Sequence, residues 1–386
     1  MEKLKNIFLE HKKAFLYGGI GLLSLIILII VIIILVNVFR RYAPSQVESM
    51  MVDAAKEYLS EHREMTPTED TPTTIEVSTL VEGKYLKDLS KLSTEEGCTG
   101  NVTIVSNNNA LRYIPELVCT NYETYSLSNT ILSRETIATS GNGLYELNNY
   151  YTYRGEYVNN YVNFVNYSWR ILKFDENMMY LVLSDTLNGD TMYVFDDRFN
   201  ESINSYRGRN EFENSRVYQT LQGFYDGYFQ NYHAYLKNMD ACVHTRSEQD
   251  QDKTGAIECF TTFNTPISLL SVYDYMNASL DSMCLIATSR NCSNYNYLST
   301  TTNRWWLMNG TNENTYQVYA SNTTGAISLD SASARKDLRI VIAIPSDVLY
   351  KDGIGTSSDP FVFYEYYKNQ DSIIFPDFSF GSSNHF

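Results

Sequence analysis

One acidic loop carries the residue spacing of a metal site. Asp250 and Asp252 stand at the first and third positions of a stretch with Gly255 at the sixth, as in the first half of an EF-hand calcium loop. Glu258 adds a third carboxylate, but Thr261 stands where an EF-hand loop has its closing Glu. Two interpretations stay open, namely a calcium site made by Asp250, Asp252 and Glu258 or a solvated acidic turn. No other cofactor is predicted.

The chain has six cysteines, all between residues 98 and 292. An even number of cysteines in an exported segment is typical of disulfide bonds, although six cysteines allow many connectivities. The simplest set joins neighbours along the chain: Cys98 with Cys119, Cys242 with Cys259, and Cys284 with Cys292. Zinc is the alternative, but no two cysteines have the C-x-x-C spacing and His244 is the only nearby imidazole.

Histidines offer little for catalysis. Nucleophilic catalysis by Ser or Cys needs an imidazole partner. Beyond the apolar N-terminal segment the histidines are His62, His233, His244 and His385. None of them belongs to a recognisable catalytic pattern, so we expect no catalytic residue and a protein that is not an enzyme.

Aromatic residues instead favour binding. The chain has 32 Tyr and is rich in Asn; Tyr provides rigid contact area, and Asn provides hydrogen bonds. Trp305, Trp306 and Tyr316 are the candidate ligand contacts. Adjacent residues of a strand point to opposite faces of the sheet, so at most one of the two Trp can be exposed. The alternative is that both indoles fill the core.

Charge is distributed unevenly along the chain. Residues 1–41 hold six Lys or Arg against two Glu, a net +4, so the rest must carry −19 for the chain to total −15. A body this acidic is repelled by nucleic-acid phosphates and by anionic headgroups. We therefore exclude nucleic acid as a partner and disfavour polyanionic ligands.

Residues 14–39 contain no charged side chain and include the run LLSLIILIIVIIILV. A helix needs about 20 apolar residues to cross a bilayer. The run ends at Arg40 and Arg41 instead of the small residues of a signal-peptide cleavage site. We predict a single-pass transmembrane helix over 14–39, with the lipid bilayer as its partner. Four Lys precede it, which leaves tail 1–13 in the cytoplasm and the C-terminal region outside the cell.

The elements that must position these residues follow from periodicity and turn signals. Helical spacing of Val47, Met51 and Tyr58 predicts an extracellular stalk helix over 40–63. A small α+β domain is expected over 64–125, with a hairpin of 97–105 and 111–119. A linker over 126–144, a larger α+β domain over 145–370 and a tail over 371–386 follow.

In the larger domain, the tyrosine-rich stretch 145–167 suits a two-faced β region. Two strands over 169–174 and 178–183 predict a hairpin. Apolar spacing predicts helices over 216–236 and 268–276. Later strands are expected at 304–308, 316–319, 338–344 and 361–365.

Four motifs lie within residues 46–125: AAKEYL, VSTLVEGKYLKDL, CTGNVTI and YIPELVCTNYET. Together they resemble the head regions of pilin-like, membrane-anchored surface proteins of Gram-positive-type bacteria. The resemblance implies a small α+β domain carried by a long helix. The chain lacks a prepilin cleavage site and the early Glu of a pilin helix. We therefore favour a fixed anchor over assembly into a pilus.

Four further motifs follow in order: WRIL at 169–172, SLLSxxDY at 268–275, WWL at 305–307 and GxGTSSDPF at 353–361. They resemble a surface domain of uncharacterised proteins of Bacilli and their relatives. The domain also looks like the C-type lectin or formylglycine-generating-enzyme fold. Where relatives tend to have Arg-Pro, this chain has Leu338-Arg339-Ile340, so we expect a different local turn.

The lectin-like resemblance implies a non-catalytic ectodomain that acts in surface recognition or adhesion, with a glycan or protein as ligand. Two alternatives stay open. The first is a pilin-like assembly component of a surface filament. The second is an enzyme of the formylglycine-generating type, which needs a reactive cysteine, whereas every cysteine here has a plausible disulfide partner.

Overall fold

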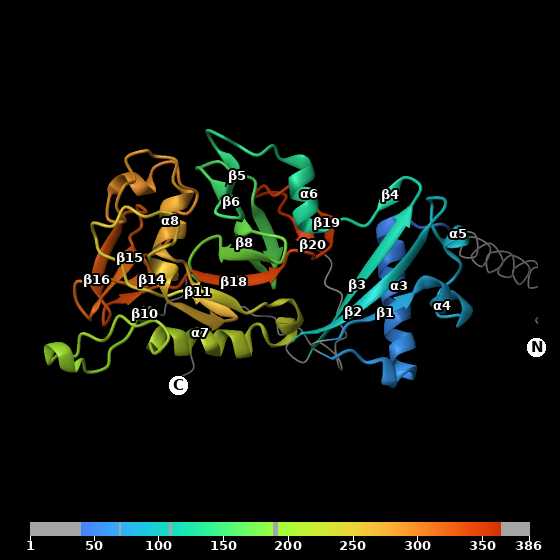
Figure 1. The fold of residues 1–386 in the computed structure, drawn as a ribbon, viewed down its shortest axis with the longest axis horizontal. Helices are drawn as coiled ribbons and strands as arrows, with labels where there is room; N and C mark the ends of the chain where they lie inside the picture. Colours follow the sequence, from blue (N-terminus) through green and yellow to red (C-terminus); the bar gives the residue numbers. More distant parts are fainter. Residues whose placement is uncertain (1–39, 69–70, 108–109, 188–191, 364–386) are drawn as a thin grey trace, which may run out of the picture. The chain divides into compact units, whose positions relative to one another are not determined.

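The computed structural model describes residues 40–68, 71–107, 110–187 and 192–363 (Figure 1). They form a mixed α+β structure with more strand than helix, which confirms the α+β class; the pilin-like and lectin-like assignments stay predictions. The chain divides into two compact units, and each is described by itself.

Three predicted segments lie outside the described residues: the cytoplasmic tail 1–13, the membrane helix 14–39 and the C-terminal tail 371–386. Within the part that the structure describes, no helix combines the length and the apolar character needed to cross a bilayer. The three segments therefore remain predictions.

The smaller unit includes residues 40–63, 75–102 and 115–123. Its main helix, α3 (Pro44–Glu61), has Pro in its first turn, where no backbone N–H is needed. Met51 is fully buried and its methyl group packs against Gly100. The Tyr122 hydroxyl donates to Glu48 Oε1 at 2.9 Å. The helix predicted over 40–63 thus packs within this unit.

The other elements before residue 124 are η1 (Arg63–Met65), β1 (Thr73–Glu76), α4 (Val77–Glu82), α5 (Leu89–Leu92), β2 (Thr99–Asn107), β3 (Ala110–Cys119) and β4 (Tyr122–Glu123). The strands pair in the order β1-β2-β3-β4, and β2 with β3 forms the predicted hairpin. The Cys98–Cys119 disulfide links the two ends of that hairpin.

The larger unit is built on a seven-stranded sheet with the order β13-β18-β9-β8-β6-β5, in which β7 also pairs with β8. Its strands are β5 (Gly143–Leu147), β6 (Tyr150–Arg154), β7 (Tyr161–Phe164), β8 (Tyr167–Phe174), β9 (Met178–Leu183), β13 (Ile267–Leu269) and β18 (Ile340–Pro345). β8 and β9 form the predicted hairpin. β18 is buried throughout, because both of its faces are covered.

A second sheet contains β14 (Trp305–Gly310), β15 (Gln317–Ser321) and β16 (Ile327–Ser331). Short ladders pair β10 (Tyr193–Val194) with β17 (Arg335–Lys336), β11 (Met239–Cys242) with β12 (Thr262–Thr265), and β19 (Tyr350–Asp352) with β20 (Val362–Phe363). The helices are α6 (Leu127–Arg134), η2 (Glu201–Ile203), α7 (Arg216–Gly227), η3 (Gln230–Tyr235), η4 (Glu258–Phe260), α8 (Val272–Ala278) and η5 (Arg290–Ser293).

Trp305 and Trp306 belong to the core, not to the surface. Both are fully buried, and every residue of β14 is buried, so this strand has no exposed face. The Trp306 indole N–H donates to Tyr193 O at 2.9 Å, and Trp305 packs edge-on against Tyr275. The prediction that these two residues contact a ligand is therefore wrong, and the alternative that both fill the core is confirmed.

Two predicted helices and the predicted linker differ from the structure. The helix expected over 216–236 ends at Gly227, and the 3₁₀ helix η3 follows it. The stretch 267–269 pairs with β18, so α8 begins only after Ser271. The linker 126–144 contains α6, whose apolar side chains belong to the core of the larger unit.

Arg339 immediately precedes β18 in the core of the larger unit. It is fully buried, and its guanidinium donates to three backbone carbonyls: Leu183 O at 2.8 Å, Leu298 O at 2.7 Å and Ser184 O at 3.0 Å. The group also lies 5.2 Å from the ring centroid of Trp305. Burial, together with the charge of Arg170, lowers the pKa of Arg339 to about 10. One side chain thus joins three segments of the fold.

We expect Arg339→Met to lower the free energy of unfolding by at least about 3 kcal/mol, because three buried carbonyls lose their donor. Arg339→Lys keeps the charge but lacks the planar fork, so it should recover only part of this stability. Urea unfolding followed by tryptophan fluorescence measures both variants. A stability equal to that of the unmodified chain in Arg339→Met would contradict the role assigned to the guanidinium.

Candidate functional site

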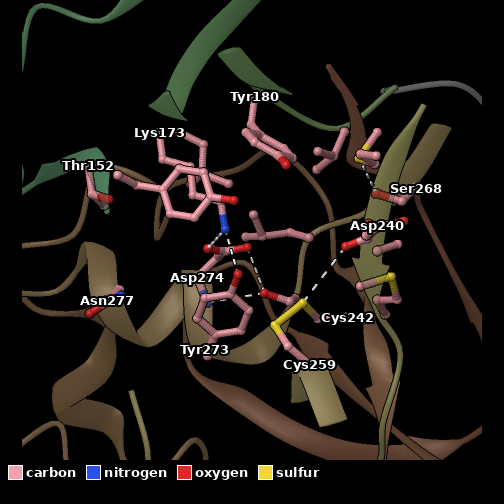
Figure 2. Close-up of a pocket in the computed structure, with 18 of the residues that line it drawn as sticks. Thr152, Lys173, Tyr180, Asp240, Cys242, Cys259, Ser268, Tyr273, Asp274 and Asn277 are labelled. Atoms are coloured by element: carbon pink, nitrogen blue, oxygen red, sulfur yellow. Dashed lines mark hydrogen bonds and ion pairs between the residues drawn. A yellow bond between two sulfur atoms is a disulfide. The ribbon is translucent and has the colours of Figure 1, made fainter. Parts of the chain in front are cut away.

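The larger unit contains a cavity of about 170 Å³ on one face of its seven-stranded sheet (Figure 2). We call it the central cavity. Its walls come from β6, β8 and β9 of the sheet, from β11 and β13, and from the first turn of α8. The cavity combines aromatic rings with charged and hydrogen-bonding groups, which makes it the candidate functional site.

Strand register brings three polar side chains into one row. Lys173 of β8 pairs with Thr152 of β6 on one side and with Tyr180 of β9 on the other. All three line the central cavity. The β8–β9 register shifts by one residue between Ile171 and Lys173, and such a bulge changes the direction of a side chain. The bulge therefore lies immediately beside the residue that is central to the site.

The Lys173 ammonium is surrounded by oxygen atoms and aromatic rings. Its Nζ donates to Asp274 Oδ1 at 2.8 Å and to the Tyr273 hydroxyl at 2.5 Å. The same atom lies 4.7, 5.1 and 5.2 Å from the ring centroids of Tyr273, Tyr150 and Tyr180. These distances are within the cation–π range. With 8% of its side chain exposed, Lys173 is a buried cation with one carboxylate partner.

The position of Asp274 is fixed by the start of α8. The Ser271 Oγ caps the helix: it accepts from the Asp274 backbone N–H at 3.2 Å and donates to Asp274 Oδ2 at 2.7 Å. This is a reciprocal capping arrangement, and the carboxylate also faces the positive end of the helix dipole. Both oxygens of Asp274 are thus engaged, one by the cap and one by Lys173.

The protonation states follow from this arrangement. Burial alone lowers the pKa of Lys173, but the charge of Asp274 and the hydrogen bonds outweigh it, so the pKa lies above its ordinary value. Burial and the Asp274 charge raise the pKa of Tyr273 to about 12. Lys173 is therefore a permanent cation and Tyr273 a neutral phenol near neutral pH. A protonated Lys is neither a nucleophile nor a base.

The opposite wall of the cavity is formed by β11 and the loop after it. The Cys242–Cys259 disulfide lies in this wall (Figure 2). Asp240 and Asn148 are solvent-exposed and line the same cavity. The Asn148 amide donates to Thr254 O at 3.2 Å. The lining of the central cavity thus includes an exposed carboxylate and an exposed amide in addition to the tyrosine rings.

Arg246 lies among the residues predicted to bind calcium. Its Nη1 donates to Glu258 Oε1 at 2.5 Å, and Nη2 donates to Asp250 O at 2.6 Å and Asp252 O at 3.3 Å. The side chains of Arg246 and Glu258 are fully buried. A guanidinium thus gathers oxygen atoms that a calcium ion would need.

The two Asp side chains of this loop are also engaged. The Asp250 carboxylate accepts from Ser247 N at 2.7 Å. Burial opposes the ionisation of Asp252, but hydrogen bonds from Thr254 and from backbone N–H groups lower its pKa. No cluster of three metal-ligating side chains occurs among the described residues. The geometry therefore favours an internally bonded turn, and it does not support calcium at Asp250, Asp252 and Glu258.

The cysteine pairing predicted from sequence is confirmed. The structure joins Cys98 to Cys119, Cys242 to Cys259 and Cys284 to Cys292, and no thiol is free. A formylglycine-generating type of chemistry, which needs a reactive cysteine, is therefore disfavoured.

The remaining predicted residues lie away from the central cavity. Tyr316 is partly buried, with the Arg207 guanidinium 5.0 Å from its ring centroid, and its ligand contact stays a prediction. His244 is hydrogen-bonded to Thr261 Oγ1 at 3.1 Å, and His233 to the Tyr225 carbonyl at 3.2 Å. None of these residues lines the central cavity.

Sequence reasoning did not single out Lys173, Tyr180 or Asp274. Two signals pointed toward them. The strand pattern WRILKF contains two charged residues, Arg170 and Lys173. The hydrophobic neighbours of Lys173 predict that its side chain is buried. Asp274 stands three residues after Ser271 in the SLLSxxDY motif, which is the spacing of a capping pair. Neither signal shows that the two residues meet.

No family model matches this chain, and neither the curated proteins nor the solved structures provide a match. The functional interpretation therefore depends on the geometry of the site.

We expect Lys173→Met or Asp274→Leu alone to lower the free energy of unfolding by about 3–5 kcal/mol, because each leaves one buried charge without its partner. The double variant should lose much less than the sum of the two. Urea unfolding of all four proteins gives the coupling energy. Additive losses would show that the two charges do not interact.

A second experiment tests the role of Arg246. We expect millimolar calcium and EDTA to leave the thermal midpoint unchanged, because the guanidinium already holds the loop oxygens. Arg246→Met should lower the free energy of unfolding by about 3–5 kcal/mol, because Glu258 becomes an unpaired buried charge. Scanning calorimetry measures both effects. A rise in the midpoint with calcium alone would restore the calcium-site interpretation.

Proposed function

We propose that this chain is a membrane-anchored bacterial surface protein whose larger unit recognises a ligand without transforming it. The observation that carries the proposal is the pairing of charges in the central cavity. Lys173 is committed to Asp274 and Tyr273 at 2.8 and 2.5 Å, so it is neither a free nucleophile nor a base. The exposed Asp240 carboxylate accepts from the Asn264 amide at 2.9 Å. What the cavity offers is ring surface and hydrogen-bonding groups.

The ligand class follows from the charged, aromatic and hydrogen-bonding side chains that line the central cavity. Because Asp274 already neutralises Lys173, the exposed carboxylate of Asp240 leaves the cavity with a net negative charge. Anionic ligands are therefore disfavoured. Tyrosine rings with Asn, Ser and Thr groups suit a neutral, hydroxyl-rich molecule such as one sugar ring of a glycan. The volume of about 170 Å³ favours a single ring.

The proposed location depends on the apolar segment 14–39 and on the disulfides. We place the N-terminus in the cytoplasm and residues after 39 outside the cell, where disulfides persist. We also propose that the smaller unit is pilin-like and that the larger unit is lectin-like. One long helix packed in the smaller unit and a mixed α+β larger unit are compatible with these assignments.

A glycan array probed with the full chain in detergent micelles tests this function, with and without calcium. We expect binding to neutral glycans and not to sulfated or phosphorylated ones. Tyr180→Ala should weaken binding about tenfold, because it removes one ring of the cavity. Tyr206→Ala is the matched control, because Tyr206 is 74% exposed and does not line the cavity.

Two results would contradict the proposal. Failure to bind any neutral glycan would reject the ligand class. Equal binding by Tyr180→Ala and Tyr206→Ala, at unchanged thermal stability, would place the binding site outside the central cavity.

A further inference from the structure

A second cavity of about 390 Å³ lies in the larger unit and shares no lining residue with the central cavity. It is bounded by the C-terminal end of α6, the residues before and at the start of β5, the β6–β7 loop and the β19–β20 loop. The last of these contains the GxGTSSDPF motif. Four parts of the chain therefore line one cavity.

Hydrogen bonds hold these loops in place. Asn142 Oδ1 accepts from Glu156 N at 2.9 Å, which ties the turn before β5 to the β6–β7 loop. Gly355 O accepts from Tyr161 N at 2.8 Å. Gly355 has a φ of 78°, and a Cβ there would lie 2.4 Å from Asn159 O, so only glycine fits this crossing of two loops. The walls of the second cavity are therefore preformed.

Two charged side chains line this cavity, Arg134 and Glu135, and Glu135 supplies its carboxylate. The Tyr153 hydroxyl donates to Glu135 Oε1 at 2.8 Å. Burial raises the pKa of Glu135, and the hydrogen bond from Tyr153 only partly offsets it. Among the described residues, Glu135 forms no ion pair within 4.0 Å. The carboxylate is thus partly buried and has no cationic partner among the described residues.

The neighbouring Arg134 is committed elsewhere. Its Nη1 donates to Gly353 O at 3.1 Å and its Nη2 to the Tyr350 hydroxyl at 3.0 Å. The guanidinium also lies 4.7 Å from the ring centroid of Tyr350. Arg134 therefore fixes the β19–β20 loop instead of neutralising Glu135.

The rest of the lining combines polar side chains of Thr and Asn with apolar and aromatic ones. Val158 and Phe361 are buried in the wall, whereas Tyr157 is 76% exposed and Ile354 is 55% exposed. Exposed large apolar side chains beside a cavity often mark a binding site. An aliphatic stem gains contact area here, and a cation gains both the Tyr157 ring and the Glu135 carboxylate.

We propose that the second cavity binds a primary ammonium group carried on an aliphatic stem, with Glu135 as its counter-ion. The two natural sources of this chemistry are the side chain of a Lys in a polypeptide and a free diamine. The net charge of −19 after residue 41 attracts either source. This site is independent of glycan recognition in the central cavity.

Isothermal titration calorimetry of the full chain in detergent micelles tests the proposal with three probes. They are cadaverine, its neutral analogue 1,5-pentanediol, and a short peptide with one central Lys and blocked ends. We expect cadaverine or the Lys peptide to bind and the diol not to bind. Tighter binding of the peptide than of cadaverine identifies a polypeptide source, and the reverse identifies a free amine.

Variants link the binding to the cavity. Glu135→Gln keeps an acceptor for Tyr153 and should weaken ammonium binding at least about tenfold. Glu176→Gln, an exposed site in the β8–β9 turn, removes the same charge without touching the cavity and should bind normally. Tyr157→Ala should weaken binding several-fold with no change in thermal midpoint, because its side chain is largely exposed.

Three outcomes would overturn the proposal. These are no binding of either amine, equal binding of cadaverine and the diol, or equal loss of affinity in Glu135→Gln and Glu176→Gln. A neutral-glycan result on the array is unaffected by any of them, because the central cavity and the second cavity share no residue.

Discussion

Buried positive charge is the constraint on which the larger unit depends. Arg339 and Arg246 are fully buried, and Lys173 has 8% of its side chain exposed. Transfer of a cation from water into a protein interior costs several kcal/mol unless oxygen atoms replace the lost water. Each of the three cations therefore fits the interior only where backbone carbonyls or carboxylates lie within about 3 Å of its nitrogen atoms.

The oxygen partners come from distant parts of the chain. Lys173 on β8 meets Asp274 on α8 across 101 residues, and Arg339, just before β18, meets Leu183 on β9 across 156 residues. These contacts tie the large sheet to the helix and loops that cover it. The central cavity lies beside Lys173, where the tyrosine rings and the ion pair occupy the space between β8 and α8. The shape of the site is thus a consequence of how one cation is satisfied.

The dependence of the site on contacts between distant residues explains which features the sequence predicts and which it does not. The β2–β3 and β8–β9 hairpins depend on short-range alternation and turns, and both were predicted. The nearest-neighbour disulfides were predicted as well. Lys173 and Asp274 could not be paired in advance, because their contact depends on a one-residue bulge in β8 and on the register of a seven-stranded sheet.

Local spacing was misleading at two places. The acidic loop around Asp250 matches half of a calcium loop, yet the nearby Arg246 donates to the Asp250 and Asp252 carbonyls and to Glu258. The apolar spacing after Pro266 suits a helix, but pairing of β13 with β18 makes residues 267–269 a strand, and α8 begins only after Ser271. A buried guanidinium is not part of the calcium-loop pattern, and sheet pairing acts over long sequence distances that local periodicity does not report.

The two cavities differ in one physical respect, which is whether their charged group already has a partner. In the central cavity the Lys173 cation is neutralised by Asp274 and the other charged side chain of the lining is Asp240, so an anionic ligand would find no counter-ion there. In the second cavity the Glu135 carboxylate is partly buried and accepts a hydrogen bond from the Tyr153 hydroxyl. A cation that binds there compensates the carboxylate for the water that burial removed. The state of pairing, and not the residue type alone, therefore decides which ligand each cavity favours.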